Sequence, residues 1–407
     1  MRIIFVTANL PHGADEAFIV PEIAEMIRSG HQVLVVPRSP VGLVIHGESL
    51  LGHTRREALC SANVLIGTAK MAGAFPVRTL RAMATISKSR TAAIAAKNLA
   101  VLPKALWLAG VAREWGAEHI YSHWAGTTAT LAMIASAVSG VPWSFTAHRW
   151  DVVENNLLRE KVESARVARF ISEDGMRMAK GLGIGRATNA RVLVMGVALP
   201  AEAGAQRQGA WHIVVCPARL VEVKGHRFLL EAWRILRSRG VHGELWLAGD
   251  GELRPHLESF IQSLGLQNSV KILGTLPHER LLRIYKEIPI SAVVLASANL
   301  GNGLHEGIPV ALIEAMGYGI PVVATATGGT PELVKPGTGL LVPPGDALAL
   351  ANALQSLLQN DELREQLGDG ARQHVLRAHN IVQVTSELAA ALTGESAGTL
   401  GNISAAA

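Results

Sequence analysis

The sequence of 407 residues lacks the features of a small disulfide-stapled domain or of a disordered chain. Its two cysteines, Cys60 and Cys216, lie far apart and fit no disulfide framework or metal-ligand spacing. Charged residues make up only 17% of the chain and hydrophobic residues 49%, which excludes wholesale disorder. The length exceeds one ordinary core and fits two domains of roughly 150–200 residues. Because cysteine is so scarce, a reducing cytosol is the expected compartment.

Charge is missing altogether from residues 120–147, which contain no Asp, Glu, Lys or Arg. That length would suit a membrane span, but His123, Gly126 and Pro142 interrupt it, so a strand, a helix and a second strand are the better interpretation. Residues 1–6 enter a strand pattern directly, without a charged leader, an apolar core or a small-residue cleavage site. We therefore expect neither a transmembrane helix nor a signal peptide.

Acidic residues are absent from Ala58 to Arg113, where apolar residues are interleaved with eight bases: Lys70, Arg78, Arg81, Lys88, Arg90, Lys97, Lys104 and Arg113. Residues 1–195 hold 22 Lys/Arg against 14 Asp/Glu, and residues 196–407 hold 16 against 19. This pattern suits peripheral contact with anionic lipid at the inner face of the plasma membrane, where each base would add about 1 kcal/mol of electrostatic attraction. A solvated basic face explains the composition equally well. Nucleic acid is not expected, since no aromatic stacking set or recognition motif is present.

Short apolar runs alternate with longer helical patterns, which is typical of βαβ units and parallel sheets. The strands predicted in the first half are Arg2–Ala8, His31–Pro37, Ala62–Gly67, His119–His123, Pro142–Ala147, Arg169–Ser172 and Arg191–Met195. A second series follows the small, polar residues 201–210: Trp211–Cys216, Glu244–Ala248, Val270–Leu273, Ile290–Leu295, Pro321–Ala324 and Gly339–Val342. The predicted helices of this half are Arg227–Arg239, Glu252–Leu264, Glu279–Glu287, Val310–Gly317 and Ala347–Gln359. The sequence thus predicts two doubly wound α/β domains, whose ligands bind at the carboxyl ends of the strands.

The segment from Glu306 to Glu314 is the richest in candidate site residues. Pro309 suits the first turn of a helix, so the N–H groups of Gly307 and Ile308 would face anionic oxygens at the positive end of that helix. Glu314 lies eight residues beyond Glu306, which lets both carboxylates address one elongated ligand. One would bind sugar hydroxyls and the other ribose hydroxyls. Two solvated glutamates are the alternative, but the flanking run is too apolar and too glycine-rich for an ordinary surface helix.

A second group of candidates follows the first predicted strand of the second half, in the segment Cys216-Pro-Ala-Arg219-Leu-Val-Glu-Val-Lys224. Arg219 and Lys224 can neutralise a diphosphate, the first by bidentate donation and the second as a point charge. Such cations would stabilise a diphosphate leaving group as it gains negative charge. Gly249 forms a tight turn after the next strand. A solvated basic loop is the alternative.

His148 closes a predicted strand of the first half, where it could bind a transferred sugar or a diphosphate, although lone histidines are more often structural. His12 and His123 could line the binding site of an acceptor substrate, although a structural role is the more common one for such residues. The three histidines lack metal-ligand spacing, and no Asp-x-Asp pair, Walker loop, nucleophile elbow or HExxH motif occurs. We therefore expect no metal and no cofactor.

Taken together, these residues resemble the family 4 glycosyltransferases of the GT-B fold. The most specific part is Glu306-x7-Glu314, followed by Ala-Met-Gly-Tyr-Gly-Ile-Pro-Val-Val-Ala-Thr and by Gly328-Gly-Thr-Pro-Glu-Leu-Val. The resemblance implies two Rossmann-like domains facing a central cleft: an acceptor-side domain at 1–198, a linker at 199–209 and a nucleotide-sugar domain at 210–375. A helix at 376–392 would return to the first domain. Residues 393–407, a tail of small residues, would be disordered.

The resemblance also implies roles for the candidate residues. Arg219 and Lys224 would bind the donor diphosphate, Glu306 the donor sugar and Glu314 the ribose, with His148 beside the reaction centre. The donor would be a nucleotide-sugar such as a UDP- or GDP-sugar. The reaction would retain anomeric configuration without a metal, the acceptor hydroxyl attacking from the face of the departing diphosphate and giving its proton to a phosphate oxygen.

Two departures from the family pattern concern substrate choice. Glu306-Gly-Ile-Pro309 replaces the common Glu-Gly-Phe-Gly and resembles exopolysaccharide transferases of the colanic-acid type, as does Ala14-Asp-Glu-Ala-Phe-Ile19. Pro11-His12-Gly13 replaces the usual double-glycine acceptor loop. These departures leave the donor sugar and the acceptor geometry open. The acid-free basic span Ala58–Arg113 is the reason to expect a lipid-linked saccharide as the acceptor. A sugar-nucleotide epimerase of the same fold is one alternative, but it needs acid/base residues on both sides of the sugar, and the spacing of Glu306 and Glu314 argues against it. A non-catalytic binding protein is the other, and the intact Arg219, Lys224, Glu306 and Glu314 argue against it.

Overall fold

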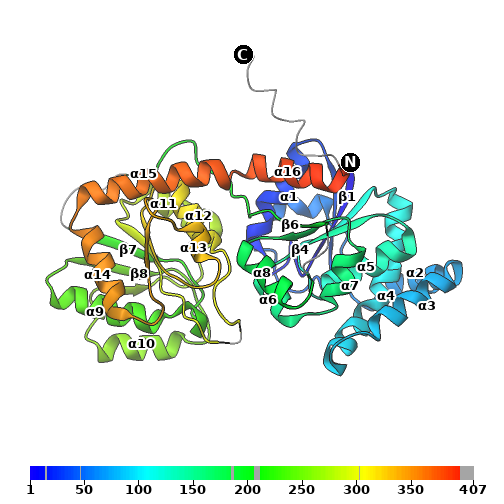
Figure 1. The fold of residues 1–407 in the computed structure, drawn as a ribbon, viewed down its shortest axis with the longest axis horizontal. Helices are drawn as coiled ribbons and strands as arrows, with labels where there is room; N and C mark the ends of the chain where they lie inside the picture. Colours follow the sequence, from blue (N-terminus) through cyan, green and yellow to red (C-terminus); the bar gives the residue numbers. More distant parts are fainter. Residues whose placement is uncertain (14–15, 46, 185–187, 206–210, 302, 395–407) are drawn as a thin grey trace, which may run out of the picture. The chain divides into compact units, whose positions relative to one another are not determined.

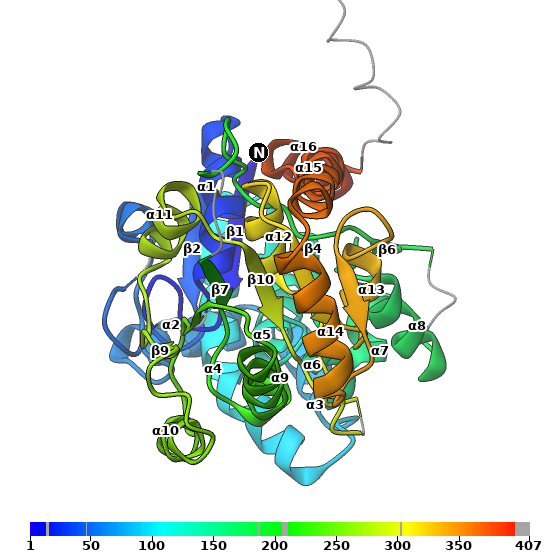
Figure 2. The same ribbon diagram turned by 90° about the vertical axis from the view of Figure 1, so that its left-hand side faces the viewer.

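The computed structural model describes residues 1–407 except 14–15, 46, 185–187, 206–210, 302 and 395–407. The chain forms two compact units (Figures 1 and 2). The N-terminal unit comprises Met1–Gly196 and the segment from Ile381 onward, and the C-terminal unit comprises Val197–Asn380. The predicted Ala14–Ile19 motif begins in residues outside the described part.

The N-terminal unit is built on a parallel six-stranded sheet with the order β2-β1-β3-β4-β5-β6. Its strands are β1 (Arg2–Thr7), β2 (Gln32–Pro37), β3 (His119–Ser122), β4 (Trp143–Ala147), β5 (Ala168–Phe170) and β6 (Ala190–Val192). Its α-helices are α1 (Val20–Arg28), α2 (Ala62–Ala74), α3 (Pro76–Ile86), α4 (Ala92–Trp115), α5 (Thr127–Ser139), α6 (Arg149–Glu154), α7 (Leu158–Ser164), α8 (Glu173–Gly181) and α16 (Ile381–Thr393). The charge-free residues 120–147 form β3, α5 and β4, as predicted.

The strand predicted at Ala62–Gly67 is wrong, because these residues form the first turns of α2. The hydroxyl of Ser61 caps this helix by accepting from the N–H of Val64. Val64 and Met71, seven residues apart, bury one helical face against the core, which a two-residue strand period does not allow. A short apolar run is compatible with either structure, and here the cap and the spacing decide for the helix.

One helix among the described residues, α4, is long and apolar enough to cross a membrane by length and composition. In the structure it packs against α2 and α5, and Leu106 and Leu108 lie in the hydrophobic core. Lys104 is fully buried in the same helix, where its ammonium donates to the carbonyl oxygens of Pro37, Arg38 and Glu57. α4 is therefore a core helix of this unit, and the hydrogen bonds of Lys104 stabilise the carboxyl end of β2.

The C-terminal unit holds a second parallel six-stranded sheet with the order β12-β11-β10-β7-β8-β9. Its strands are β7 (His212–Cys216), β8 (Gly243–Leu247), β9 (Val270–Ile272), β10 (Ala292–Leu295), β11 (Val322–Thr325) and β12 (Leu340–Val342). Its α-helices are α9 (His226–Ser238), α10 (Arg254–Ser263), α11 (His278–Glu287), α12 (Val310–Gly317), α13 (Thr330–Leu333), α14 (Ala347–Leu358) and α15 (Asp361–Ala378). Every predicted element of this half therefore exists, with ends shifted by at most two residues.

The C-terminal helix α16 belongs to the N-terminal unit. It packs against α1, and its Leu388 and Leu392 join the cluster of buried residues that includes Ile3 and Phe5 of β1. Arg166 donates to the carbonyl oxygen of Leu392 at 2.9 Å. The segment predicted at 376–392 thus begins in α15 and continues as α16, and the first unit ends at Gly196 rather than at residue 198. The predicted tail lies almost entirely outside the described residues.

Candidate functional site

Lys224 and Glu306 form an ion pair in the C-terminal unit. Lys224 ends the short 3-10 turn Glu222–Lys224 that follows β7, and Glu306 lies in the loop between β10 and α12. The Lys224 Nζ donates to Glu306 Oε2, and the hydroxyl of Ser297 donates to the same oxygen at 3.1 Å. The two side chains are only 19% and 14% exposed. Burial raises the pKa of Glu306, but the Lys224 ammonium and the hydrogen bonds from Ser297 and Gly307 together outweigh it. The pKa therefore lies below its ordinary value and the carboxylate is ionised.

Glycines allow the two loops of this pair to approach neighbouring backbone. Gly225, directly after Lys224, has a positive φ of 63°, and a Cβ there would lie 2.0 Å from the carbonyl oxygen of Ala296. A Cβ on Gly328 would lie 1.9 Å from the carbonyl oxygen of Glu306. Any side chain would push these loops apart, so the glycines fix the position of the ion pair.

Glu314 lies in the middle of α12 and has a partner that the sequence did not reveal. His278, the first residue of α11, hydrogen-bonds through Nε2 to Glu314 Oε1 at 2.7 Å. This hydrogen bond raises the pKa of His278 above its ordinary value, although burial opposes the shift. The two residues are 36 positions apart, so no spacing rule could have paired them. Ser297, which donates to Glu306, was also missed, because no motif in the sequence marks it.

Replacing His278 with glutamine is expected to lower the free energy of unfolding by about 1 kcal/mol near pH 6, because a charge-assisted hydrogen bond is lost. A histidine whose folded-state pKa is raised contributes stability that is complete below about pH 6.5 and is lost as the pH rises through the folded-state pKa. The difference between wild type and variant should therefore shrink toward pH 9. Urea unfolding at several pH values measures it, with His256→Gln on exposed α10 as control; a difference that does not change with pH would contradict the ion pair.

Arg219 and Gly249 lie at the ends of neighbouring strands. Arg219 follows β7 and is exposed, and the part of the chain that the structure describes offers its guanidinium no ion-pair partner. Gly249 follows β8, where a Cβ would lie 2.0 Å from the carbonyl oxygen of Ala218. The tight turn predicted at Gly249 is thus a close approach to the backbone that carries Arg219. Its guanidinium remains free for an anionic ligand.

The start of α12, where the sequence predicted an anion site, differs from that prediction in two respects. Pro309 is the N-cap of the helix rather than its first residue. The N–H of Gly307 donates to Glu306 Oε1 at 3.3 Å, so it already serves the carboxylate. Ile308 is 7% exposed, and its side chain packs beside Gly329. The structure therefore brings Glu306, Gly307 and Lys224 into one contact group, with Glu314 and His278 in another.

In the N-terminal unit, His148 follows β4 and belongs to a cluster of aromatic and imidazole rings. Its imidazole lies 4.5 Å from the Trp124 ring and 5.3 Å from that of His123, between ring centroids, with Phe18 at 5.7 Å. Burial lowers the pKa of His148 well below its ordinary value, so the imidazole is neutral at physiological pH. Its Nε2 atom has no hydrogen-bond partner among the described residues. His148 can therefore offer one hydrogen bond without a charge.

Behind this cluster lies a buried network of charges. Arg169 NH1 donates to Glu22 Oε2 at 2.7 Å, and His123 Nδ1 lies 3.4 Å from Glu22 Oε1. Burial raises the pKa of Glu22, but Arg169 and His123 outweigh it and lower the pKa to about 2. His123 and His12 are also buried, at 0% and 5% exposure.

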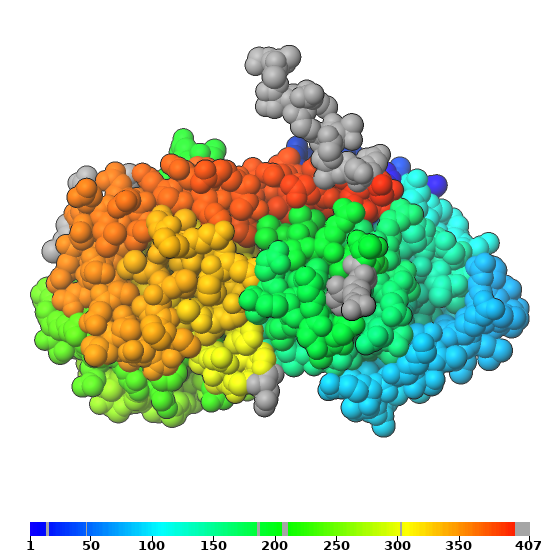
Figure 3. All heavy atoms as spheres, in the orientation of Figure 1, coloured from blue at the N-terminus to red at the C-terminus, as the bar shows by residue number. Residues whose placement is uncertain are grey.

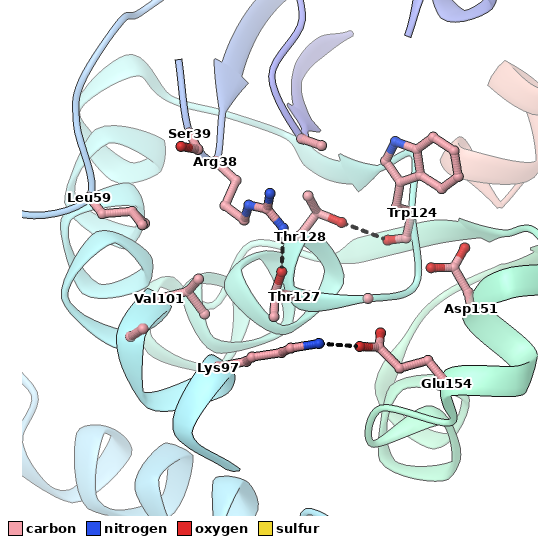
Figure 4. A pocket seen from close by; sticks show the side chains of 13 residues that line it. Arg38, Ser39, Leu59, Lys97, Val101, Trp124, Thr127, Thr128, Asp151 and Glu154 are labelled. Atoms are coloured by element: carbon pink, nitrogen blue, oxygen red, sulfur yellow. Dashed lines mark hydrogen bonds and ion pairs between the residues drawn. The ribbon is translucent and has the colours of Figure 1, made fainter. Parts of the chain in front are cut away.

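A cavity of about 470 Å³ opens in the N-terminal unit at the carboxyl ends of β1, β2 and β3 (Figure 4). Arg38 donates to Thr127 Oγ1 at 2.7 Å on one side, and Lys97 pairs with Glu154 at 3.2 Å on the other. Asp151 also lines it, and burial raises the pKa of its carboxyl to about 6. The sequence reasoning missed this cavity, because its walls come from strand ends, α4 and α6, which only the fold brings together.

Comparison with known proteins identifies the chain's relatives. Residues 206–374 match the family model described as glycosyl transferases group 1. The chain is 40% identical over 149 residues to the amylovoran biosynthesis glycosyltransferase AmsK of Erwinia amylovora, covering 36% of each protein. It is 37% identical over 182 residues to the putative colanic acid biosynthesis glycosyltransferase WcaL of Escherichia coli, covering 44% of each. The match thus spans well under two thirds of these curated relatives.

Two solved structures share the fold over nearly the whole chain. Anabaena HepE in complex with UDP has a TM-score of 0.73 at 19% identity, with 97% of this chain and 100% of that one covered. Sucrose-phosphate synthase from Thermosynechococcus elongatus has a TM-score of 0.71 at 19% identity, with 96% and 98% covered. With its two Rossmann-like units, the chain has the GT-B fold, and its residues 206–374 are similar to the group 1 glycosyl transferases.

Proposed function

We propose that this protein is a retaining glycosyltransferase that moves a sugar from a nucleotide-sugar to a saccharide acceptor in exopolysaccharide or other glycoconjugate biosynthesis. The observation that carries the proposal is the ionised Glu306 held by Lys224, at the first glutamate of the Glu306-x7-Glu314 motif. AmsK and WcaL are named for amylovoran and colanic acid. HepE was solved with UDP and with UDP-glucose, which supports a nucleotide-sugar donor.

In the proposed reaction, the donor diphosphate binds Arg219 and Lys224. These cations stabilise the charge that develops as the glycosidic bond breaks, and no metal is needed. Glu306 holds the hydroxyls of the transferred sugar, and Glu314 exchanges its bond with His278 for the ribose hydroxyls. The acceptor hydroxyl attacks from the face that the diphosphate leaves, and a phosphate oxygen takes its proton.

The N-terminal unit would hold the acceptor. Its cavity at the strand ends presents Arg38, Lys97 and the carboxylates of Asp151 and Glu154, which are suitable partners for sugar hydroxyls. The neutral imidazole of His148 would donate or accept one hydrogen bond beside the reaction centre. We propose a lipid-linked saccharide as the acceptor and the cytoplasm as the site of the reaction.

Turnover is expected to survive removal of divalent cations by EDTA, because the protein itself supplies the positive charge at the leaving group. The measurement is product formation from a panel of UDP- and GDP-sugars with isolated lipid-linked saccharides, with the anomeric configuration of the product read by NMR. Loss of turnover in EDTA, restored by manganese or magnesium, would refute the metal-independent mechanism. Epimerised nucleotide-sugar without acceptor would indicate an epimerase, and binding without any product a non-catalytic protein.

A further inference from the structure

Two helices of the N-terminal unit, α2 and α3, expose apolar side chains on the faces that point away from the core. Ile66 is 68% exposed, Leu80 64%, Val77 59% and Leu65 51%. Figures 1 and 3 show both helices on the outside of this unit, away from its sheet. Apolar residues at such positions gain nothing from the protein's own core.

The other faces of the two helices already pack against the core. Val64 and Met71 of α2 and Ala82 and Ile86 of α3 are buried in the core of the N-terminal unit. A helix on the surface of a soluble protein normally carries polar residues on its other face. On α3 the opposite face instead combines Val77, Leu80 and Arg81, so the helix is apolar on two sides.

Unpaired bases accompany these apolar residues. Lys70 on α2, Arg81 on α3, and Lys88 and Arg90 just beyond α3 are exposed and have no ion-pair partner in the described part of the chain. The other bases of the acid-free stretch are engaged: Arg78 with the Val138 carbonyl, Arg113 with that of Ser139, Lys97 with Glu154 and Lys104 with three carbonyl oxygens. The structure thus reduces the eight bases to four that are free to meet an anionic partner.

We propose that α2 and α3 dock on an anionic lipid bilayer. Leu65, Ile66, Val77 and Leu80 enter the boundary between headgroups and acyl chains, while Lys70, Arg81, Lys88 and Arg90 contact the lipid phosphates. Exposed apolar side chains flanked by bases, with no acid between residues 58 and 113, are the composition that an anionic interface binds. The inference does not rest on the transfer reaction, since lipid binding and sugar transfer are measured separately.

The test is flotation of the full chain with vesicles of phosphatidylcholine alone and of phosphatidylcholine mixed with phosphatidylglycerol. The wild type is expected to float with the anionic vesicles only, and less as ionic strength rises past roughly 0.15 M, where the Debye length is about 8 Å. Changing Lys70, Arg81, Lys88 and Arg90 to glutamine should reduce the bound fraction at least tenfold. Ile66→Ser with Leu80→Ser should reduce it similarly without changing the charge.

The matched control changes Arg280, Arg283 and Lys286 to glutamine, three exposed bases on α11 of the C-terminal unit. Vesicle binding of this variant should equal that of the wild type. Unfolding in urea shows whether each variant is folded, which is expected because none of the changed side chains is buried. Equal flotation with neutral and anionic vesicles, no flotation of the wild type at low salt, or an equal loss in the α11 control would each overturn the proposal.

Discussion

Replacing Lys224 with alanine is expected to weaken the binding of a nucleoside diphosphate by about a hundredfold. The variant loses a charge-assisted contact to the diphosphate, worth roughly 1.5–3 kcal/mol. It also leaves the Glu306 carboxylate without its cation beside an anionic ligand. Arg219→Ala removes a contact but uncovers no buried charge, because Arg219 is exposed, so its effect should be nearer tenfold. Calorimetry with UDP and GDP measures both.

A double variant separates the lost contact between Lys224 and the diphosphate from the repulsion between Glu306 and the diphosphate. Lys224→Ala combined with Glu306→Gln should bind more tightly than Lys224→Ala alone, since the uncompensated carboxylate is gone. Lys271→Ala is the matched control, because Lys271 pairs with Glu244 in the same unit but outside the candidate site. Unchanged affinity in both Lys224→Ala and Arg219→Ala would show that the diphosphate binds elsewhere.

Replacing Arg169 with methionine is expected to destabilise the N-terminal unit by about 3–5 kcal/mol. Arg169 and Glu22 are both fully buried, and removal of one partner leaves the other charge without compensation. Adding Glu22→Gln should recover part of the loss. Urea unfolding measures the series, and Arg177→Met, which breaks an exposed pair with Asp174, should cost less than about 1 kcal/mol.

The same pair predicts how stability depends on acid. The pKa of Glu22 falls from 4.5 to about 2, so its stabilisation is complete above pH 4.5 and is lost as the pH falls through about 2. A shift of this size corresponds to about 3 kcal/mol, in the range expected from removing Arg169. A wild type and an Arg169→Met variant that lose stability equally between these pH values would contradict the network.

The sequence predicted the C-terminal unit well because its signals are local. The helix at Val310–Gly317 has its predicted bounds, since a proline precedes it and a glycine ends it. The strand predicted at Ala62–Gly67 was wrong because a short apolar run is compatible with a strand or a helix. The close approach of Gly67 to Trp107 of α4 is a contact between distant segments that the local sequence does not show.

The partners of the candidate residues were beyond such reasoning. Glu306 and Glu314 were found from their spacing, but what holds each carboxylate comes from elsewhere: Lys224 lies 82 positions before Glu306, and His278 lies 36 before Glu314. Glu22 and Arg169 are 147 positions apart. These pairs depend on strand order and loop approach, which one sequence does not encode in any short pattern.

The placement of α16 has a consequence for how the protein is made. Residues 1–196 leave the ribosome without the helix that covers Ile3 and Phe5, and that helix is translated only after the whole C-terminal unit. The C-terminal unit is one continuous stretch of chain, Val197–Asn380, and needs no later segment for its core. The N-terminal unit is translated first, but its core is complete only when α16 has been made. A chain that ends before residue 381 therefore contains the whole C-terminal unit and an N-terminal unit that lacks α16.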